Sequence, residues 1–103
     1  MNTSDVDALK LAVETIDRAR ALNTEETYAA AEQAWKLMNG ACIDTLRKLM
    51  KGPVQDGDLP SKVGRNILLE VGLAVQICVN FESGYTAATN AAHMVFHHGR
   101  DNG

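Results

Sequence analysis

The chain has 103 residues, 46% of them apolar and 22% charged, with a formal net charge of −3. This composition is typical of a folded globular domain and excludes an intrinsically disordered chain. The length predicts one domain over residues 1–103, and the acidic balance excludes a protein that is basic over its whole surface.

The sequence carries no signal for export or for membrane insertion. Residues 1–10, MNTSDVDALK, lack a basic segment followed by an apolar one. The most apolar window, ILLEVGLAVQICV, is interrupted by Glu70 and is too short to span a bilayer. Cys42 and Cys78 form no CxxC pair, which argues against a disulfide framework or a zinc site. We therefore expect a cytoplasmic protein that has no membrane partner.

The first expected element is a helix over residues 5–22. Ser4 and Asp7 resemble a capping box, so the helix is expected to start just after Ser4. Asn23 and Thr24 interrupt the pattern, and Thr24 is the expected N-cap of the next helix. The first helix presents an apolar stripe with three- and four-residue spacing, formed by Val6, Leu9, Val13 and Ile16.

A heptad-like seam runs through the segment that begins at residue 25. It can pack against the first helix or against a second subunit, so residues 1–39 are candidate helices for a homodimer through the helix 1/helix 2 seam. Asn39-Gly40 falls inside the seam. This dipeptide is a common helix terminator, because Gly just past a helix end readily adopts the left-handed conformation. Two alternatives remain: one helix from 25 to 51, or a stop near 39 and a new helix from 41. The seam consists of Tyr28, Ala31, Trp35, Met38, Cys42, Thr45 and Leu49.

Residues 52–60, GPVQDGDLP, are expected to form a loop, because Gly, Pro and Asp dominate them. Ser61 is the expected N-cap of a helix over 62–71, and Gly72 is expected to end it. A projection of 100° per residue divides this helix into two sides. The side expected to be buried holds Val63, Ile67, Leu68 and Val71 with Gly64, and the other side holds Lys62, Arg65, Asn66 and Leu69.

The periodicity changes after Gly72. Alternation over residues 74–81 predicts a half-buried strand with Val75, Ile77, Val79 and Phe81 on one face. Residues 82–84 are expected to form the turn and residues 85–89 the returning strand. Thr89 or Asn90 is then expected to cap a last short helix. The fold class is therefore mainly α with a small β-hairpin (α+β), and the alternative is an all-α helical bundle.

Two short sequence segments near the hairpin resemble those of a known family. LLEVGL (68–73) ends the 62–71 helix, and YTAAT (85–89) closes the hairpin before a further helix. In this order they resemble the winged helix-turn-helix domains of bacterial and phage transcription regulators, over about residues 41–98. The resemblance implies a DNA-binding fold in which the 62–71 helix is the recognition helix. The 52–60 segment has room for about one turn of the family's middle helix.

Basic charge gathers in the middle of the chain. Residues 45–66 carry five basic and two acidic side chains, whereas residues 1–44 carry four basic and eight acidic ones. A local excess of this kind can bind phosphates on an acidic protein. The alternative is that the cations are solvated helix faces without a ligand.

The resemblance implies roles for particular side chains. Lys62 and Arg65 would contact phosphates or guanine edges, and Asn66 would pair with adenine. The helix that precedes the loop would support the DNA backbone through Arg47, Lys48 and Lys51. Double-stranded DNA is thus the expected partner. Leu69, on the same side as these polar residues, favours the alternative of a protein–protein interaction module, an adaptor or inhibitor that does not bind nucleic acid.

Residues for catalysis or metal binding are not grouped in any known motif. His93 and His97 share a helix face at metal-ligand spacing and His98 follows them, but no nearby carboxylate or cysteine completes a site. Glu25-Glu26 and the pair Asp56 and Asp58 are typical of a helix start and a turn. We therefore expect no catalytic residue, no enzyme activity, no metal site and no cofactor.

Overall fold

The computed structural model describes residues 1–19 and 24–100, with Thr24 described by its backbone alone. It is mainly helical with a small three-stranded antiparallel sheet, which confirms the α+β class and rules out the all-helical alternative. No helix among the described residues combines the length and the apolarity needed to cross a bilayer. The elements are α1 (Thr3–Ala19), α2 (Thr24–Leu37), α3 (Gly40–Leu49), β1 (Val54–Gln55), the 3₁₀ turn η1 (Asp56–Asp58), α4 (Lys62–Val71), β2 (Ala74–Val79), β3 (Glu82–Ala88), α5 (Asn90–Met94) and the π-helical turn η2 (Val95–Gly99).

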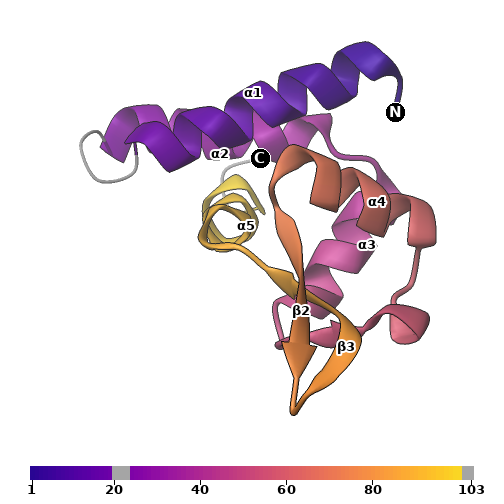
Figure 1. The fold of residues 1–103 in the computed structure, drawn as a ribbon. Helices are drawn as coiled ribbons and strands as arrows, with labels where there is room; N and C mark the ends of the chain where they lie inside the picture. Colours follow the sequence, from indigo (N-terminus) through magenta and orange to yellow (C-terminus); the bar gives the residue numbers. More distant parts are fainter. Residues whose placement is uncertain (20–23, 101–103) are drawn as a thin grey trace.

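The helices α1 and α2 lie side by side, and the hairpin of β2 and β3 projects away from all the helices (Figure 1). One cluster of buried apolar side chains runs through α1, α2, α3, α4 and α5. Only the base of the hairpin reaches this cluster, through Ala74 on β2 and Ala88 on β3. The two parts expected from the sequence, residues 1–39 and 41–98, therefore share a core.

The first helix starts earlier than its sequence predicts. The side-chain oxygen of Asn2 accepts a hydrogen bond of 2.9 Å from the backbone N–H of Asp5. The N-cap is therefore Asn2, and the capping box predicted at Ser4 is wrong, because Ser4 already lies inside the helix. The predicted stripe is buried at three of its four positions. The predicted end at residue 22 lies outside the described residues.

The seam segment is divided into two helices, as the second alternative predicts. Asn39 makes the division, since its side-chain oxygen accepts a hydrogen bond of 3.0 Å from the backbone N–H of Cys42. Gly40 is the first residue of α3 and not a left-handed helix end, so the reason given for the break is wrong. Most of the seam packs inside the chain's own core, and a homodimer through it stays a prediction. The buried seam residues are Ala31, Met38, Cys42, Thr45 and Leu49.

The boundaries of α4 are those that the sequence predicts. The hydroxyl oxygen of Ser61 accepts a hydrogen bond of 2.9 Å from the backbone N–H of Gly64. Gly72 ends the helix with φ of 89°, a left-handed conformation that favours glycine. Local capping chemistry is therefore sufficient to place this helix in the sequence.

The buried side of α4 is rotated from the predicted one. Gly64, Leu68 and Val71 are buried, but Val63 is 65% exposed. Leu69, expected on the solvent side, is half-buried and packs against the core. The cause is the crossing of α4 over α3, which brings Gly64 against the α3 backbone and turns Val63 outward.

Gly64 makes the α3–α4 crossing close. A methyl group at this position would lie 2.5 Å from the carbonyl oxygen of Ala41 and 2.9 Å from the hydroxyl oxygen of Thr45. Neither atom has room to move, because Ala41 contributes main chain and the Thr45 hydroxyl donates a 2.8 Å hydrogen bond to that same carbonyl. A side chain at position 64 would therefore push the two helices apart.

The segment 52–60 contains more structure than the predicted loop. Val54 and Gln55 form β1, which pairs with Thr86 and Tyr85 of β3, and η1 follows directly. The strand order in the sheet is β1-β3-β2, so β3 is central and β2 lies at one edge. The loop prediction is wrong here because β1 is defined by pairing with residues 30 and 32 positions away, which no local pattern shows.

The hairpin turn lies earlier than predicted. Val79 pairs with Glu82, and the two residues between them, Asn80 and Phe81, have φ of 52° and 66°. These positive values are typical of a type I′ turn. Gly84, expected in the turn, is a strand residue with φ of 90° beside a register shift, which is a β-bulge.

The face predicted for the first strand of the hairpin is only partly buried. Ile77 and Val79 are half-buried, whereas Val75 is 45% exposed and Phe81 is fully exposed. The alternation is correct, but the hairpin extends beyond the core, so its outer residues have nothing to pack against.

The C-terminal helix starts at the predicted cap. The Thr89 hydroxyl accepts a 3.3 Å hydrogen bond from the backbone N–H of Ala92 and donates a 3.0 Å hydrogen bond to the carbonyl oxygen of Gly72. One side chain therefore links the start of α5 to the end of α4. Near the end of the described residues, Gly99 is buried against Trp35.

The close crossing at Gly64 gives a stability test. Gly64→Ala is expected to lower the free energy of unfolding by about 1–3 kcal/mol, because the new methyl group overlaps the α3 backbone. Gly40→Ala is the matched control: it is also in a helix, nothing lies within 4 Å of the added methyl group, and stability should be unchanged or slightly higher. Urea unfolding followed by circular dichroism measures both, and equal stability of the two variants would contradict the crossing.

Candidate functional site

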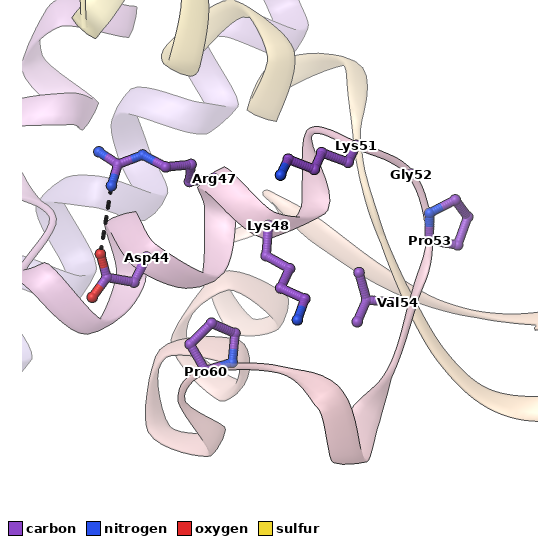
Figure 2. Close-up of a pocket in the computed structure, with 8 residues that line it drawn as sticks. All are labelled: Asp44, Arg47, Lys48, Lys51, Gly52, Pro53, Val54 and Pro60. Atoms are coloured by element: carbon purple, nitrogen blue, oxygen red, sulfur yellow. Dashed lines mark ion pairs between the residues drawn. The ribbon is translucent and has the colours of Figure 1, made fainter.

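Three of the predicted cations line one open groove. Arg47 and Lys48 are exposed in the last turn of α3, and Lys51 is exposed in the turn that follows this helix. Figure 2 shows Lys48 extending toward Pro60, while Arg47 turns to the other side and meets Asp44. We call this the basic groove; it has a volume of about 400 Å³ and is lined by Asp44, Arg47, Lys48, Lys51, Gly52, Pro53, Val54 and Pro60.

The sequence of α3 places the cations on one side of the helix. Positions 47, 48 and 51 lie within one turn of each other, whereas Leu46 and Leu49 are fully buried on the opposite side. Burial of the leucines therefore turns the basic residues to solvent. Arg47 and Lys48 also lie in the last turn, where the helix dipole favours positive charge.

The basic groove carries net positive charge. Arg47 and Asp44 form an ion pair of 3.8 Å, but both side chains are about 60% exposed, so water screens the pair and it contributes little. Among residues 1–19 and 24–100, no acidic group lies within ion-pair distance of Lys48 or Lys51. Pro53 and Pro60 on the facing wall carry no charge and have restricted backbones. The groove therefore presents two available ammonium groups beside a rigid wall.

Arg65 is not available in the way the sequence predicts. Its Nη1 atom lies 3.5 Å from Oδ2 of Asp56, and its side chain is only 15% exposed. Its Nε and Nη2 atoms donate hydrogen bonds of 3.2 and 2.9 Å to Oδ1 of Asn66. The guanidinium is therefore held against the protein by Asp56 and Asn66, and its proposed contact with DNA stays a prediction.

Asp56 is the residue that holds Arg65, and the sequence analysis assigned it only to a turn. Its carboxylate also accepts hydrogen bonds from the Thr86 hydroxyl on β3 and, at 3.4 Å, from the Gln76 amide on β2. Thr86 is fully buried, so this contact lies at the base of the sheet. Asp56 therefore joins η1, both strands of the hairpin and α4. No local signal identifies such a residue, because its partners lie up to 30 positions away.

The remaining predicted residues lie on α4. Lys62 is exposed and lines a second hollow with Asp56, Gly57, Leu59 and Arg65, on the α4 side of Pro60. Asn66 is exposed one turn later. The exposed side of α4 consists of Lys62, Val63, Asn66 and Glu70, which is one cation, one acid and two uncharged residues. The basic surface of the described residues thus lies mainly on α3, with Lys62 at its margin.

The histidines lie together at the C-terminal end. The rings of His93 and His97 stack with centroids 6.2 Å apart, and the His98 ring packs on Tyr28 at 4.3 Å. In the part of the chain that the structure describes, no three potential metal ligands of the His, Cys, Asp or Glu type are grouped. His93 also lines a hollow that contains Lys51, Gly52 and Pro53, so this histidine lies next to the basic groove.

The two cysteines differ in environment. Cys42 is buried in the core, and Cys78 is exposed on β2. Burial raises the pKa of the Cys42 thiol, and the opposing influence of the Asn39 backbone does not cancel this. Cys42 is therefore a small apolar core residue, whereas Cys78 is accessible to reagents.

Comparison with known proteins adds no identity to this site, since no family model, curated protein or solved structure matches the chain.

The contacts of Asp56 lead to a prediction. Asp56→Asn is expected to lower the free energy of unfolding by about 1–3 kcal/mol. The neutral amide cannot form the ion pair with Arg65, and it has one oxygen acceptor where the carboxylate has two, so the hydrogen bond from buried Thr86 is weakened or lost. Asp58→Asn, an exposed aspartate in the same turn, is the matched control and should change stability by less than about 0.5 kcal/mol. Urea unfolding measures both, and equal effects would show that Asp56 does not hold the sheet to α4.

The raised pKa of Cys42 predicts a loss of stability at alkaline pH. Above the ordinary thiol pKa the unfolded chain releases a proton that the folded chain keeps, so folding is progressively disfavoured as pH rises. Cys42→Ala has no thiol to titrate, so its free energy of unfolding lacks this pH-dependent loss. The difference in the free energy of unfolding between wild type and variant should therefore narrow between pH 7 and about pH 10. Urea unfolding across this range measures the gap, and a constant gap would contradict the raised pKa.

Proposed function

We propose that this chain is a small, non-enzymatic DNA-binding protein of the transcription-regulator type, and that the basic groove contacts the phosphate backbone of duplex DNA. The observation that carries the proposal is that Arg47, Lys48 and Lys51 all line one groove, whose facing wall includes Pro60 just before α4. Phosphate contacts from Lys and Arg supply most of the affinity of proteins for DNA.

The order of elements supports the same proposal. From α3 onward the chain runs through a helix, a short helical turn, a second helix, a hairpin and a last helix. This is the order implied by the resemblance to winged helix-turn-helix domains, with η1 in the place of the middle helix. On this proposal residues 41–98 are a winged-helix-like part with a reduced middle helix, and α4 is the element nearest the bases.

The ion pair of Arg65 with Asp56 supports a different assignment of the main contacts. On this proposal Lys48 and Lys51, rather than Arg65, are the main phosphate contacts. Lys62 extends the basic surface to α4, and the Asn66 amide nitrogen is the donor nearest to base edges on that helix. Binding of this kind is electrostatic and weakens steeply with salt.

A salt titration tests the proposal. Labelled duplex DNA is titrated with wild type and with Lys48→Glu/Lys51→Glu, and fluorescence anisotropy is followed as salt is raised from about 50 to 200 mM. The variant should bind at least about tenfold more weakly, and its plot of log affinity against log salt should be shallower by about two phosphate contacts.

Lys10→Glu/Lys36→Glu is the matched control, because it makes the same change of net charge at exposed lysines of α1 and α2. It should retain the wild-type salt dependence and most of the affinity. Equal weakening in both variants would mean that only net charge matters. Absence of wild-type binding at about 50 mM salt, where electrostatic contacts are strongest, would rule the proposal out.

A second candidate function is a protein–protein interaction module that docks through α4. It is favoured by the exposure of Val63, at 65%, on a helix side whose single cation and single acid balance. Leu69, the residue that first suggested this alternative, packs against the core and does not contribute. The salt titration separates the two functions, because a protein-binding α4 gives the chain no salt-dependent affinity for DNA.

A further inference from the structure

The strand β2 has a free edge that lacks the usual protection. Because β3 is central, only one side of β2 is paired. On the unpaired side, every second residue of β2 directs its backbone N–H and C=O groups away from the sheet. Native proteins protect such edges with charged side chains, proline or a bulge. Between Glu70 and Glu82 the sequence has no charged residue and no proline.

The bulge of the hairpin does not protect this edge either. Ile77 pairs with Tyr85 and Val79 with Glu82, so the extra residue belongs to β3 and β2 runs uninterrupted. Val75 is 45% exposed on β2, and Phe81 is fully exposed at the turn. The edge therefore combines unpaired backbone with exposed apolar side chains.

We propose that two copies of this chain pair through their β2 edges as antiparallel strands related by a twofold axis, with Cys78 of each copy opposite Cys78 of the other. The resulting sheet is continuous across both copies. We propose this contact in preference to the seam of α2 and α3, because most of the seam is buried within each chain. The inference does not depend on DNA binding.

Self-complementarity identifies a second copy as the occupant. In an antiparallel pair related by a twofold axis, each side chain meets one from the same strand, so a charged edge repels itself and an uncharged one does not. With Cys78 at the axis, Ile77 lies opposite Val79 of the second copy, and this apolar pair occurs twice. Val75 lies level with the hairpin turn of the second copy, which carries the exposed Phe81.

The register is testable because Cys78 is exposed. Directly opposite residues of antiparallel strands have Cα atoms about 4.5–5.5 Å apart, which is within the range that a disulfide accepts. Mild oxidation by dissolved oxygen with a copper–phenanthroline catalyst, which removes two electrons and two protons from the two thiols, should therefore link Cys78 to Cys78. Cys42 is buried and should not react. Cys78→Ser should abolish the crosslink.

The dimer itself is measured by analytical ultracentrifugation of the full chain from about 1 µM to 1 mM, a range suited to a small interface. The mass should rise to twice the 11.1 kDa of one chain. Val75→Lys places a charge on each edge and should raise the dissociation constant at least about tenfold. Val63→Lys, the same change at an exposed valine of α4, should dimerise like wild type.

Four results would overturn the proposal. The first is a single-chain mass at every concentration, which would leave the edge to another partner, and the second is a mass that grows beyond two copies. The third is equal dimerisation of Val75→Lys and wild type, and the fourth is a loss of dimer in Val63→Lys equal to that in Val75→Lys. A dimer that Val75→Lys dissociates but that gives no Cys78 crosslink would overturn the register. Circular dichroism of each variant checks that the fold is retained.

Discussion

The carboxylate of Asp56 is the contact on which the arrangement of the C-terminal half depends. It receives the Thr86 hydroxyl, the Gln76 amide and the Arg65 guanidinium, and thereby joins η1, the hairpin and α4. Hydrogen bonds to a partly buried charge are stronger than the same bonds in water, and leaving such a charge without partners destabilises the fold. The orientation of α4 against the hairpin follows from this one residue and from the close crossing at Gly64.

The same contact decides which cations of this region are exposed. Because Asp56 pairs with Arg65, the exposed cations are Arg47 and Lys48 on α3, Lys51 after it, and Lys62 on α4. The proposed DNA contact therefore uses the helix before the sheet more than the helix after it. The hairpin contributes no cation between Glu70 and Glu82, so it is better suited to pairing with a second copy than to contacting phosphates.

The elements that the sequence predicts well are those whose causes are local. Ser61 and Thr89 cap the helices they were expected to cap, and Gly72 ends α4, because each signal acts within four residues. The failures concern distant partners. The strand β1 exists only because it pairs with β3, and Asp56 matters only because it meets Thr86. The turn at Asn80-Phe81 was missed because Gly84, the stronger turn signal, sits in a bulge instead.

The sequence by itself determined the helix caps, the alternation of the hairpin and the gathering of basic residues over positions 45–66. Only the tertiary structure decided which of those residues face solvent, because the crossing of α3 and α4 sets the rotation of both helices. That crossing turned Val63 outward and Leu69 toward the core. A helical projection shows which residues share a side, but only packing against the rest of the chain shows which side is covered.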